Sequence, residues 1–405
     1  MTHSQSATTA EQNTSRRDVL IVLALLFTVG WATNHFVAMM PVLHDDEHIS
    51  DAALEGAFAI YAIGLLPGLL TGGGLSDRIG RRPVVLTGAT GAALGNLLML
   101  IWHTEPGVFV GRFIVGLGVG LAVSAGTAWS ADVGGVRGTV LAGLTLTCGF
   151  AIGPFASGLI AQFTDGAALI APFIVTVVAS LAAVAAGFGV STPRSASPAS
   201  PAQDDAPLEC GDVPAARSDK SLFRALATSL PMSFWVFSAV ATSVVTMAGR
   251  MTDFSGPWVP GVAAVLALGS GVVSQALARR GSWGPPAGIA GALLAATGFV
   301  VVAVGGSDPA PIAFLIASIL LGAGYGLCLR EGLLDVEEYT PPERRGLATG
   351  VYYVGTYLGF GLPLLLRAVE PSVGIVGPLL VIAACAAACA LVRAGQIRSG
   401  ILARH

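Results

Sequence analysis

Charge is scarce in this chain, and its scarcity excludes a soluble globular protein. Of the 405 residues, 11% are Asp, Glu, Lys or Arg and 54% are hydrophobic, whereas about a quarter of a typical soluble domain is charged. The mean hydropathy is +0.75. Too few polar side chains are present to cover a soluble surface, so we expect an integral membrane protein.

Lysine and paired cysteines are also lacking. Lys220 stands alone beside 20 arginines and the net charge is −3, so the chain offers no broad basic surface and we exclude nucleic acid as a partner. The cysteines number five, and four of them lie in apolar runs, which predicts neither a disulfide framework nor a metal site. Because nucleotide-binding and nucleophile motifs are missing as well, we expect neither an enzyme nor a cofactor.

Long apolar runs are abundant and predict twelve membrane-spanning helices in two groups of six. The first run is too long for a signal-peptide core and has no cleavage site, so it should remain as a helix. The first group is expected near 19–43, 52–75, 84–102, 107–130, 138–162 and 168–190. The second is expected near 226–248, 257–278, 285–305, 310–330, 346–367 and 373–394.

These groups define the domain organisation. Residues 1–18 are expected to form a disordered cytoplasmic tail, 19–190 an N-terminal six-helix bundle, 191–225 a proline-rich cytoplasmic linker, 226–394 a C-terminal bundle and 395–405 a second cytoplasmic tail. With the N-terminus inside, 17 of the 21 Lys and Arg residues fall on the cytoplasmic side. The sequence therefore predicts a multi-pass protein of the inner (cytoplasmic) membrane, with both termini inside.

A charged turn between the second and third predicted helices is the most specific motif. Its spacing is G-x-x-x-D-R-x-G-R-R, and it consists of Gly73, Asp77, Arg78, Gly80, Arg81 and Arg82. This loop resembles the signature loop of the major facilitator superfamily of transporters, in particular its drug:proton antiporter branch. The resemblance implies an all-α fold of two parallel six-helix repeats, with the substrate site between them.

We hypothesise that this loop is a conformational latch. Family resemblance places the second helix against the eleventh, so Asp77 would lie near the positive N-terminal end of that helix. Arg81 would then bridge Asp77 to Asp132 and favour an outward-open state. The alternative is that the basic loop only anchors the topology.

The two halves carry matching motifs. Gly73, Asp77, Arg81 and Arg82 recur 198 residues later, at the same spacing, as Gly271, Gln275, Arg279 and Arg280. The triplet Gly116, Gly118, Gly120 recurs as Gly322, Gly324, Gly326. These matches favour an internal duplication.

Arg112 opens a stretch that resembles the R-x-x-x-G-x-G-x-G motif of the family's fourth helix. In related antiporters the matching arginine takes part in proton coupling, and the resemblance implies that role here. The alternative is that the side chain snorkels to the outer headgroups.

The fifth predicted helix has a smooth face that should let another helix approach closely. Its residues Gly149, Gly153, Pro154, Ser157 and Gly158 are similar to a motif found mainly in antiporters of the superfamily. Ser157 stands where the family pattern has Gly. The alternative is that these residues only allow close helix packing and do not indicate the direction of transport.

Few other polar groups lie at membrane depth. Coupling candidates are His35 and Glu331, although a lone histidine often only satisfies hydrogen bonds. The tyrosines combine an apolar ring with a hydroxyl and suit a cavity for a flat or amphipathic solute. The candidates for such a cavity are Asn34, Tyr61, Tyr325, Arg330, Tyr353 and Tyr357.

Three functions fit these observations. The first is a secondary active transporter that exports a drug or metabolite in exchange for protons by alternating access. The second is proton-coupled uptake of a small nutrient, and the third is a membrane sensor that transports nothing. The expected partners are a small-molecule substrate, protons and the lipid bilayer, and we expect a monomer.

Overall fold

The computed structural model describes residues 2–164, 166–190, 221–252 and 255–402, with the backbone alone described for residues 2–15, 136 and 342. Within these ranges every regular element is a helix, and twelve helical spans are long and apolar enough to cross a membrane. The predicted all-α fold with six plus six spans is confirmed.

The first half contains five continuous helices. They are α1 (Thr2–Glu47), α2 (Asp51–Ile79), α3 (Arg81–Ile101), α4 (Glu105–Phe163) and α5 (Ile170–Gly187). Helix α4 contains two spans, Glu105–Gly135 and Arg137–Phe163. They meet at Gly135, whose φ of 58° lies in the left-handed region that glycine adopts without strain.

The second half contains six more spans, and two of them are interrupted by short segments of π-helix or 3-10 helix. The first consists of α6 (Leu222–Ala241), η1 (Thr242–Met247) and η2 (Ala248–Arg250). Next come α7 (Val259–Arg280), α8 (Pro286–Gly305) and α9 (Pro311–Tyr339), followed by η3 (Pro342–Arg344). The eleventh span is α10 (Arg345–Leu358), η4 (Gly359–Gly361) and α11 (Leu362–Val373), and α12 (Val376–Arg398) is the twelfth.

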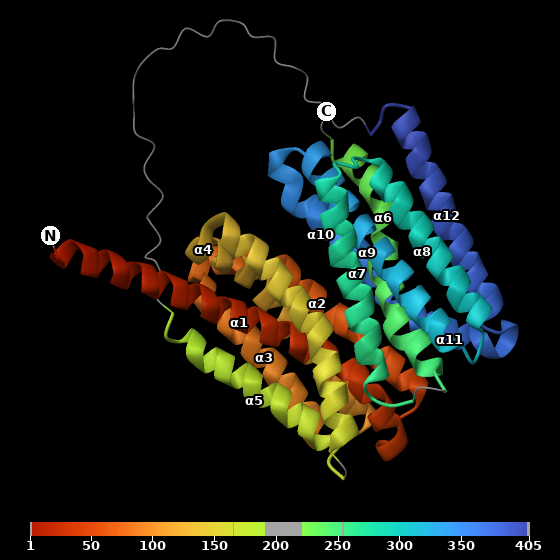
Figure 1. The fold of residues 1–405 in the computed structure, drawn as a ribbon, viewed down its shortest axis with the longest axis horizontal. Helices are drawn as coiled ribbons and strands as arrows, with labels where there is room; N and C mark the ends of the chain where they lie inside the picture. Colours follow the sequence, from red (N-terminus) through yellow and green to blue (C-terminus); the bar gives the residue numbers. More distant parts are fainter. Residues whose placement is uncertain (1, 165, 191–220, 253–254, 403–405) are drawn as a thin grey trace, which may run out of the picture.

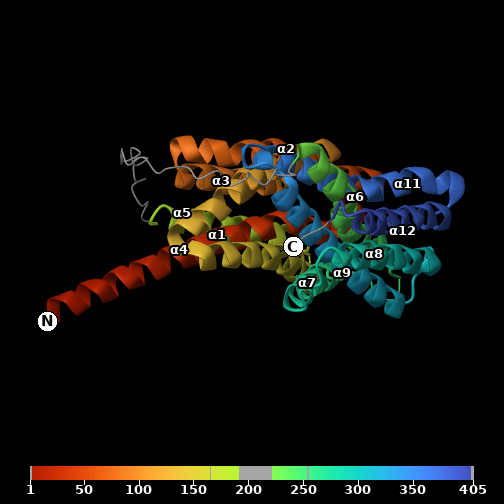
Figure 2. The ribbon, with the colours of Figure 1, turned by 90° about the horizontal axis from the view of Figure 1, so that it is seen from above.

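Two expectations at the ends of the bundles differ from the structure. The tail predicted to be disordered is helical, because α1 begins at Thr2 and runs out from the first bundle toward the N-terminus (Figure 2). The membrane-capable part of α1 begins only at Arg16. Most of the predicted linker, residues 191–220, lies outside the described residues, and its last part belongs to α6.

The halves form two bundles that lie side by side (Figure 1). Because the spans alternate in direction, one end of the molecule carries the Gly80 turn together with Arg137, Arg280 and Arg345, and we call it the arginine-rich end. The other end carries the 48–50 turn, Asp308 and Glu370, and we call it the acidic end. The arginine-rich end is the predicted cytoplasmic side.

The first glycine triplet explains how the N-terminal bundle packs. A Cβ added at Gly116 would lie 2.2 Å from the carbonyl oxygen of Tyr61 on α2, and one at Gly118 would lie 2.4 Å from that of Gly88 on α3. Hence α4 fits between α2 and α3 only because these positions have no side chain.

The second triplet repeats this packing in the C-terminal bundle. A Cβ at Gly322 would lie 2.1 Å from the carbonyl oxygen of Ala267 on α7, and one at Gly324 would lie 2.8 Å from the backbone nitrogen of Ala295 on α8. The matched motifs therefore hold equivalent helices at equivalent places, as an internal duplication predicts.

Candidate functional site

A cavity of about 660 Å³ lies between the two halves, and we call it the central cavity. It reaches from Asn34 and Tyr61 in the membrane interior to Gly73 and Arg345 at the arginine-rich end. Four of the predicted tyrosines, Tyr61, Tyr325, Tyr353 and Tyr357, line it together with Asn34. With the predicted orientation, the cavity extends toward the cytoplasm.

Aromatic rings stack along the C-terminal wall of the central cavity. The ring of Phe237 stacks on that of Phe360 at 4.7 Å and on that of Tyr357 at 4.8 Å, with interplanar angles of 15° and 30°. Tyr325 extends this stack, 6.3 Å from Phe237. Such rings offer an apolar face for a flat solute, and two of them also offer hydroxyl groups.

Charge is sparse along the cavity wall. Arg345, at the arginine-rich end, is the one charged residue among the described residues that line it. The polar remainder consists of hydroxyls and the amide of Asn34, whose Nδ2 donates to the carbonyl oxygen of Phe150 at 3.0 Å. The cavity is therefore built for apolar contact and a few hydrogen bonds.

Toward the acidic end, aromatic rings from the two halves close the central cavity. Phe360 contacts Phe58 edge-on at 5.0 Å and Tyr61 edge-on at 6.2 Å. Since Phe58 and Tyr61 belong to α2 and Phe360 belongs to η4, these contacts hold the halves together.

Beyond the rings, ion pairs join the halves a second time. Arg367 of α11 donates to Asp51 at 2.8 Å and to Glu55 at 3.4 Å, and both carboxylates belong to α2. We call these three residues the outer gate. Neither Asp51 nor Glu55 was predicted as a functional residue from the sequence, and Arg367 was expected only as the last residue of a span. The available signal was two acids one helical turn apart at the start of a span.

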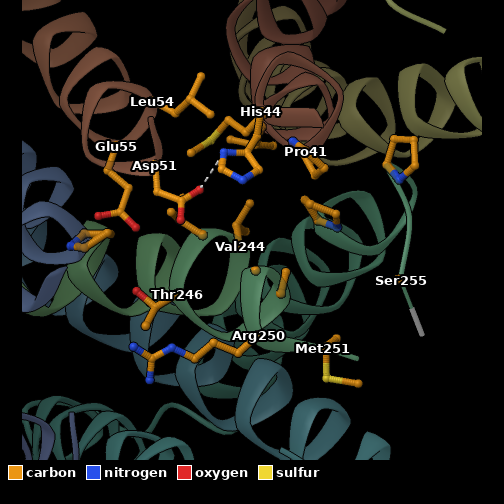
Figure 3. A pocket seen from close by; sticks show the side chains of 18 of the residues that line it. Pro41, His44, Asp51, Leu54, Glu55, Val244, Thr246, Arg250, Met251 and Ser255 are labelled. Carbon is orange, nitrogen blue, oxygen red and sulfur yellow. Dashed lines mark ion pairs between the residues drawn. The ribbon is translucent and has the colours of Figure 1, made fainter. Parts of the chain in front are cut away.

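A second cavity of about 450 Å³ lies outside the outer gate, at the acidic end (Figure 3). We call it the outer cavity. Asp51 and Glu55 line it from α2, His44 from α1 and Arg250 from η2 (Figure 3). Arg250 donates to Glu370 of α11 at 3.0 Å, so a second ion pair lies beside the gate.

The sequence matches a known family over almost its whole length. The family profile described as Major Facilitator Superfamily matches residues 20–394. The chain belongs to the major facilitator superfamily. It is accordingly a transporter and a multi-pass protein of the inner membrane, and the resemblance stated from the charged turn is confirmed.

Curated relatives of this superfamily member match over a short segment. The multidrug resistance protein MdtL of Klebsiella pneumoniae (strain 342) is 33% identical over 104 residues, which is 26% of each chain. The MdtL protein of Escherichia coli (strain K12 / DH10B) is 32% identical over 98 residues, 24% of this chain and 25% of the relative. The chain thus aligns with about a quarter of the length of these relatives.

Solved structures share the fold across nearly the whole chain. The POT family transporter PepTSo superimposes with a TM-score of 0.74, covers 96% of this chain and 99% of its own, and is 16% identical. A POT peptide transporter in complex with alafosfalin gives a TM-score of 0.74 at 14% identity, with 95% and 94% covered. At these identities the likeness establishes the superfamily fold alone.

The contacts of Arg81 and Arg82 hold the superfamily's charged turn in place. Arg81 contacts Asp77, donates to Asp132 at 3.2 Å and donates to Ser76 at 2.7 Å, so the predicted three-residue chain is present. Arg82 donates to the carbonyl oxygens of residues 188 and 190, and Arg78 is exposed. Gly80 makes the turn at a φ of 98°.

The predicted docking of this turn on the eleventh span is not made in this conformation. No ion pair joins Asp77 to α10 among the described residues, and a Cβ at Gly346, at the start of α10, would meet no atom within 4 Å apart from its chain neighbours and its own helix backbone. Further inside, a Cβ at Gly350 would meet Leu70 of α2 at 2.7 Å. This separation at the arginine-rich end is the arrangement that the latch hypothesis assigns to the released state.

Arg112 does not snorkel to the headgroups. Its side chain is 1% exposed, donates to the carbonyl oxygen of Thr33 at 2.8 Å and lies over the rings of Phe36 and Tyr61 at 4.6 and 4.5 Å. Among the described residues no ion pair to Arg112 is present. The guanidinium is therefore held by carbonyl dipoles and aromatic faces, directly behind a tyrosine that lines the central cavity.

His35 points away from the central cavity. Its Nε2 donates to Oδ1 of Asn96 on α3 at 2.9 Å, and its ring packs edge-on against Phe173 of α5 at 4.7 Å. Asn96 in turn donates to the carbonyl oxygen of Ala32 at 2.9 Å. This geometry favours a histidine that satisfies hydrogen bonds within the bundle.

Two predicted residues of the second half also lie outside the cavity lining. Arg330 pairs with Glu331, and Glu331 is fully buried against Arg393 of α12 at 3.1 Å. Arg393 pairs with Asp335 at 2.7 Å as well. Arg393 lies within α12, inside the predicted span 373–394, and these two ion pairs bury it completely.

The antiporter-like motif packs closely on both sides. A Cβ at Gly149 would lie 2.2 Å from the carbonyl oxygen of Phe27, and one at Gly153 would lie 2.7 Å from Cα of Trp31, both on α1. Ser157 accepts a hydrogen bond from Nε1 of Trp31 at 2.9 Å. Ser157, which departs from the family pattern, therefore accepts a hydrogen bond that a glycine at this position could not accept with a side chain.

The far end of the motif contacts the other half. A Cβ at Gly158 would lie 2.3 Å from the carbonyl oxygen of Pro257, and one at Gly261 on α7 would lie 2.9 Å from the backbone carbon of Pro154. The smooth face thus brings the two halves into backbone contact near the acidic end.

Proposed function

We propose that this superfamily member exports small, flat or amphipathic organic compounds in exchange for protons by alternating access. The observation that carries the proposal is the aromatic central cavity, with Arg345 as its one charged lining residue among those described. Its volume of about 660 Å³ suits a drug-sized solute. The MdtL relatives support export of this kind of compound, over the short segment that they share with this chain.

The same cavity disfavours a peptide as substrate. A peptide with free ends carries an ammonium and a carboxylate, and burying both away from water requires partners of opposite charge. The described lining offers a guanidinium but no carboxylate. The likeness to peptide transporters, at 14–16% identity, therefore supports the fold and not a peptide substrate.

Arg112 is a coupling candidate that contacts a side chain of the cavity lining. Its guanidinium lies 4.5 Å from the ring of Tyr61, so a solute that displaces Tyr61 would disturb it. Arginine stays protonated in proteins and has no acceptor. We therefore propose that Arg112 senses the occupied cavity while an acidic group elsewhere carries the proton.

The decisive test is transport of a fluorescent amphipathic dye into everted membrane vesicles that contain the protein. Export predicts that the dye accumulates when the vesicle interior is acidified and that a protonophore abolishes accumulation. Accumulation in right-side-out vesicles instead would indicate uptake, and accumulation in neither would favour a sensor that transports nothing.

Two substitutions localise the site. Tyr357→Ala removes a ring that stacks on Phe237 and should weaken dye transport about tenfold, since one aromatic contact contributes about 0.5–1.5 kcal/mol beyond the area it buries. Phe223→Ala removes a ring that is 84% exposed on the outside and should leave transport unchanged. Equal transport by both variants would place the substrate outside the central cavity.

A further inference from the structure

Glu55 has an unusual position in the outer gate. The residue is 7% exposed, one carboxylate oxygen is bonded to Arg367 at 3.4 Å, and the other is buried without a hydrogen-bond partner. Asp51, one turn earlier, holds the shorter bond to the same guanidinium at 2.8 Å. Two carboxylates thus share the guanidinium of Arg367, and Glu55 makes the longer and weaker of the two hydrogen bonds.

The neighbouring charges do not supply the missing partner. Arg250, on η2, is engaged by Glu370 at 3.0 Å. The imidazole of His44 on α1 lies 3.4 Å from the carboxylate of Asp51 (Figure 3), and it forms no ion pair with Glu55. The charged and titratable groups that surround Glu55 in the gate and the outer cavity are His44, Asp45, Asp51, Arg250, Arg367 and Glu370.

Closing the gate changes the solvation of Glu55 much more than that of its neighbours. When the halves separate at the acidic end, water reaches both carboxylates. When they close, Asp51 keeps a good ion pair and stays half-exposed, whereas Glu55 is buried with one bare oxygen. An ionised oxygen in that position is costly, and a neutral carboxyl group is much less so.

A proton also corrects the balance of charge. With Glu55 neutral, Arg367 and Asp51 form a one-to-one ion pair across the two halves. The outer cavity supplies the route, because Glu55 lines it together with the exposed residues His44 and Asp45. Water at the acidic end can therefore deliver a proton to this carboxyl group.

We propose that Glu55 is a proton-binding site of the outer gate, and that closure of the gate takes up one proton from the side of the acidic end. The proton passes from water to the unpartnered carboxylate oxygen and returns to water when the gate reopens. The inference rests on the proposed alternating-access function for its role in the transport cycle. Gate closure itself is measured without any substrate.

The test measures the distance between spin labels at the acidic end. Cysteines replace the exposed residues Asp46 and Ser307, one in each half, after the native cysteines have been removed. In otherwise unchanged protein, the short-distance population should grow as the pH falls from mildly alkaline to acidic. Growth in the opposite direction would overturn the proposal.

Substitutions identify the group that titrates. Glu55→Gln imitates the protonated form, so the short-distance population should be high at every pH and its pH dependence should vanish. Asp51→Asn leaves Glu55 as the only carboxylate on Arg367, so the response should shift to lower pH. A response in Glu55→Gln equal to that of the parent protein would refute the assignment.

Two matched controls exclude other titrating groups. Glu370→Gln removes a carboxylate from the same cavity, and His44→Gln removes the nearby imidazole. Both should keep the parent protein's pH response, and loss of the response in either would assign it to that residue instead of Glu55.

Dye transport separates this inference from the proposed function. If Glu55→Gln removes the pH response while even the parent protein moves no dye, the proton site stands and the proposed function fails. If the parent protein exports dye but Glu55→Gln retains the normal pH response, the function stands and the proton site fails.

Discussion

Gly158→Ala tests whether the contact between α4 and the two residues that precede α7 holds the acidic end closed. The new Cβ would lie 2.3 Å from the carbonyl oxygen of Pro257 and 2.7 Å from Cα of Trp258, whereas ordinary contact begins at 3.4 Å. Both obstacles are backbone atoms, so the helices must separate by about 1 Å. Overpacking of this kind costs about 1–3 kcal/mol.

This cost falls on one conformation. The contact lies near the acidic end and exists only while the halves are together there, so the substitution should disfavour the present state relative to one that is open at that end. A cost of about 2 kcal/mol changes such an equilibrium roughly 30-fold. Labels at Asp46 and Ser307 should therefore shift strongly to longer distances, and dye transport should slow.

Gly143→Ala is the matched control for this substitution. It adds the same methyl group to the same α4 helix, but the added Cβ would meet no atom within 4 Å apart from its chain neighbours and the backbone of its own helix. Its distances should equal those of the parent protein. Equal label distances in Gly158→Ala and Gly143→Ala would refute the claim that this backbone contact controls closure.

Three further predictions concern the ends of the bundles. Arg393→Ala leaves two buried carboxylates without their shared partner and should destabilise the protein by about 3–5 kcal/mol, seen as a lower midpoint of thermal unfolding in detergent. Asp77→Asn should cut transport severely and shift the halves toward the inward-open state if the latch hypothesis holds, while Gln275→Ala should be nearly silent; equal transport by the two would leave the loop as a topology anchor. A cysteine at Asp45 should react with an impermeant thiol reagent outside intact cells and one at Ser399 should not, and the opposite labelling would reverse the predicted orientation.

The sequence by itself determined the secondary structure and the framework of the bundles. Twelve apolar runs of membrane length have no stable alternative to helices in a bilayer, because every backbone polar group must be satisfied within its own segment. The glycine triplets at 116–120 and 322–326 also indicated close helix packing from the sequence alone, since only residues without side chains allow helix backbones to approach so closely. The contact of Arg81 with Asp77 in the charged turn also followed from the sequence, because the two oppositely charged residues are only four positions apart.

Tertiary structure alone decided which polar groups face the cavity. Asn34 and His35 are adjacent in the sequence, yet only Asn34 lines the central cavity, because rotation of α1 turns His35 toward α3 and α5. The outer gate joins Glu55 to Arg367 across 312 residues. No local pattern encodes such a pair, because it depends on how two independently formed bundles meet at the acidic end.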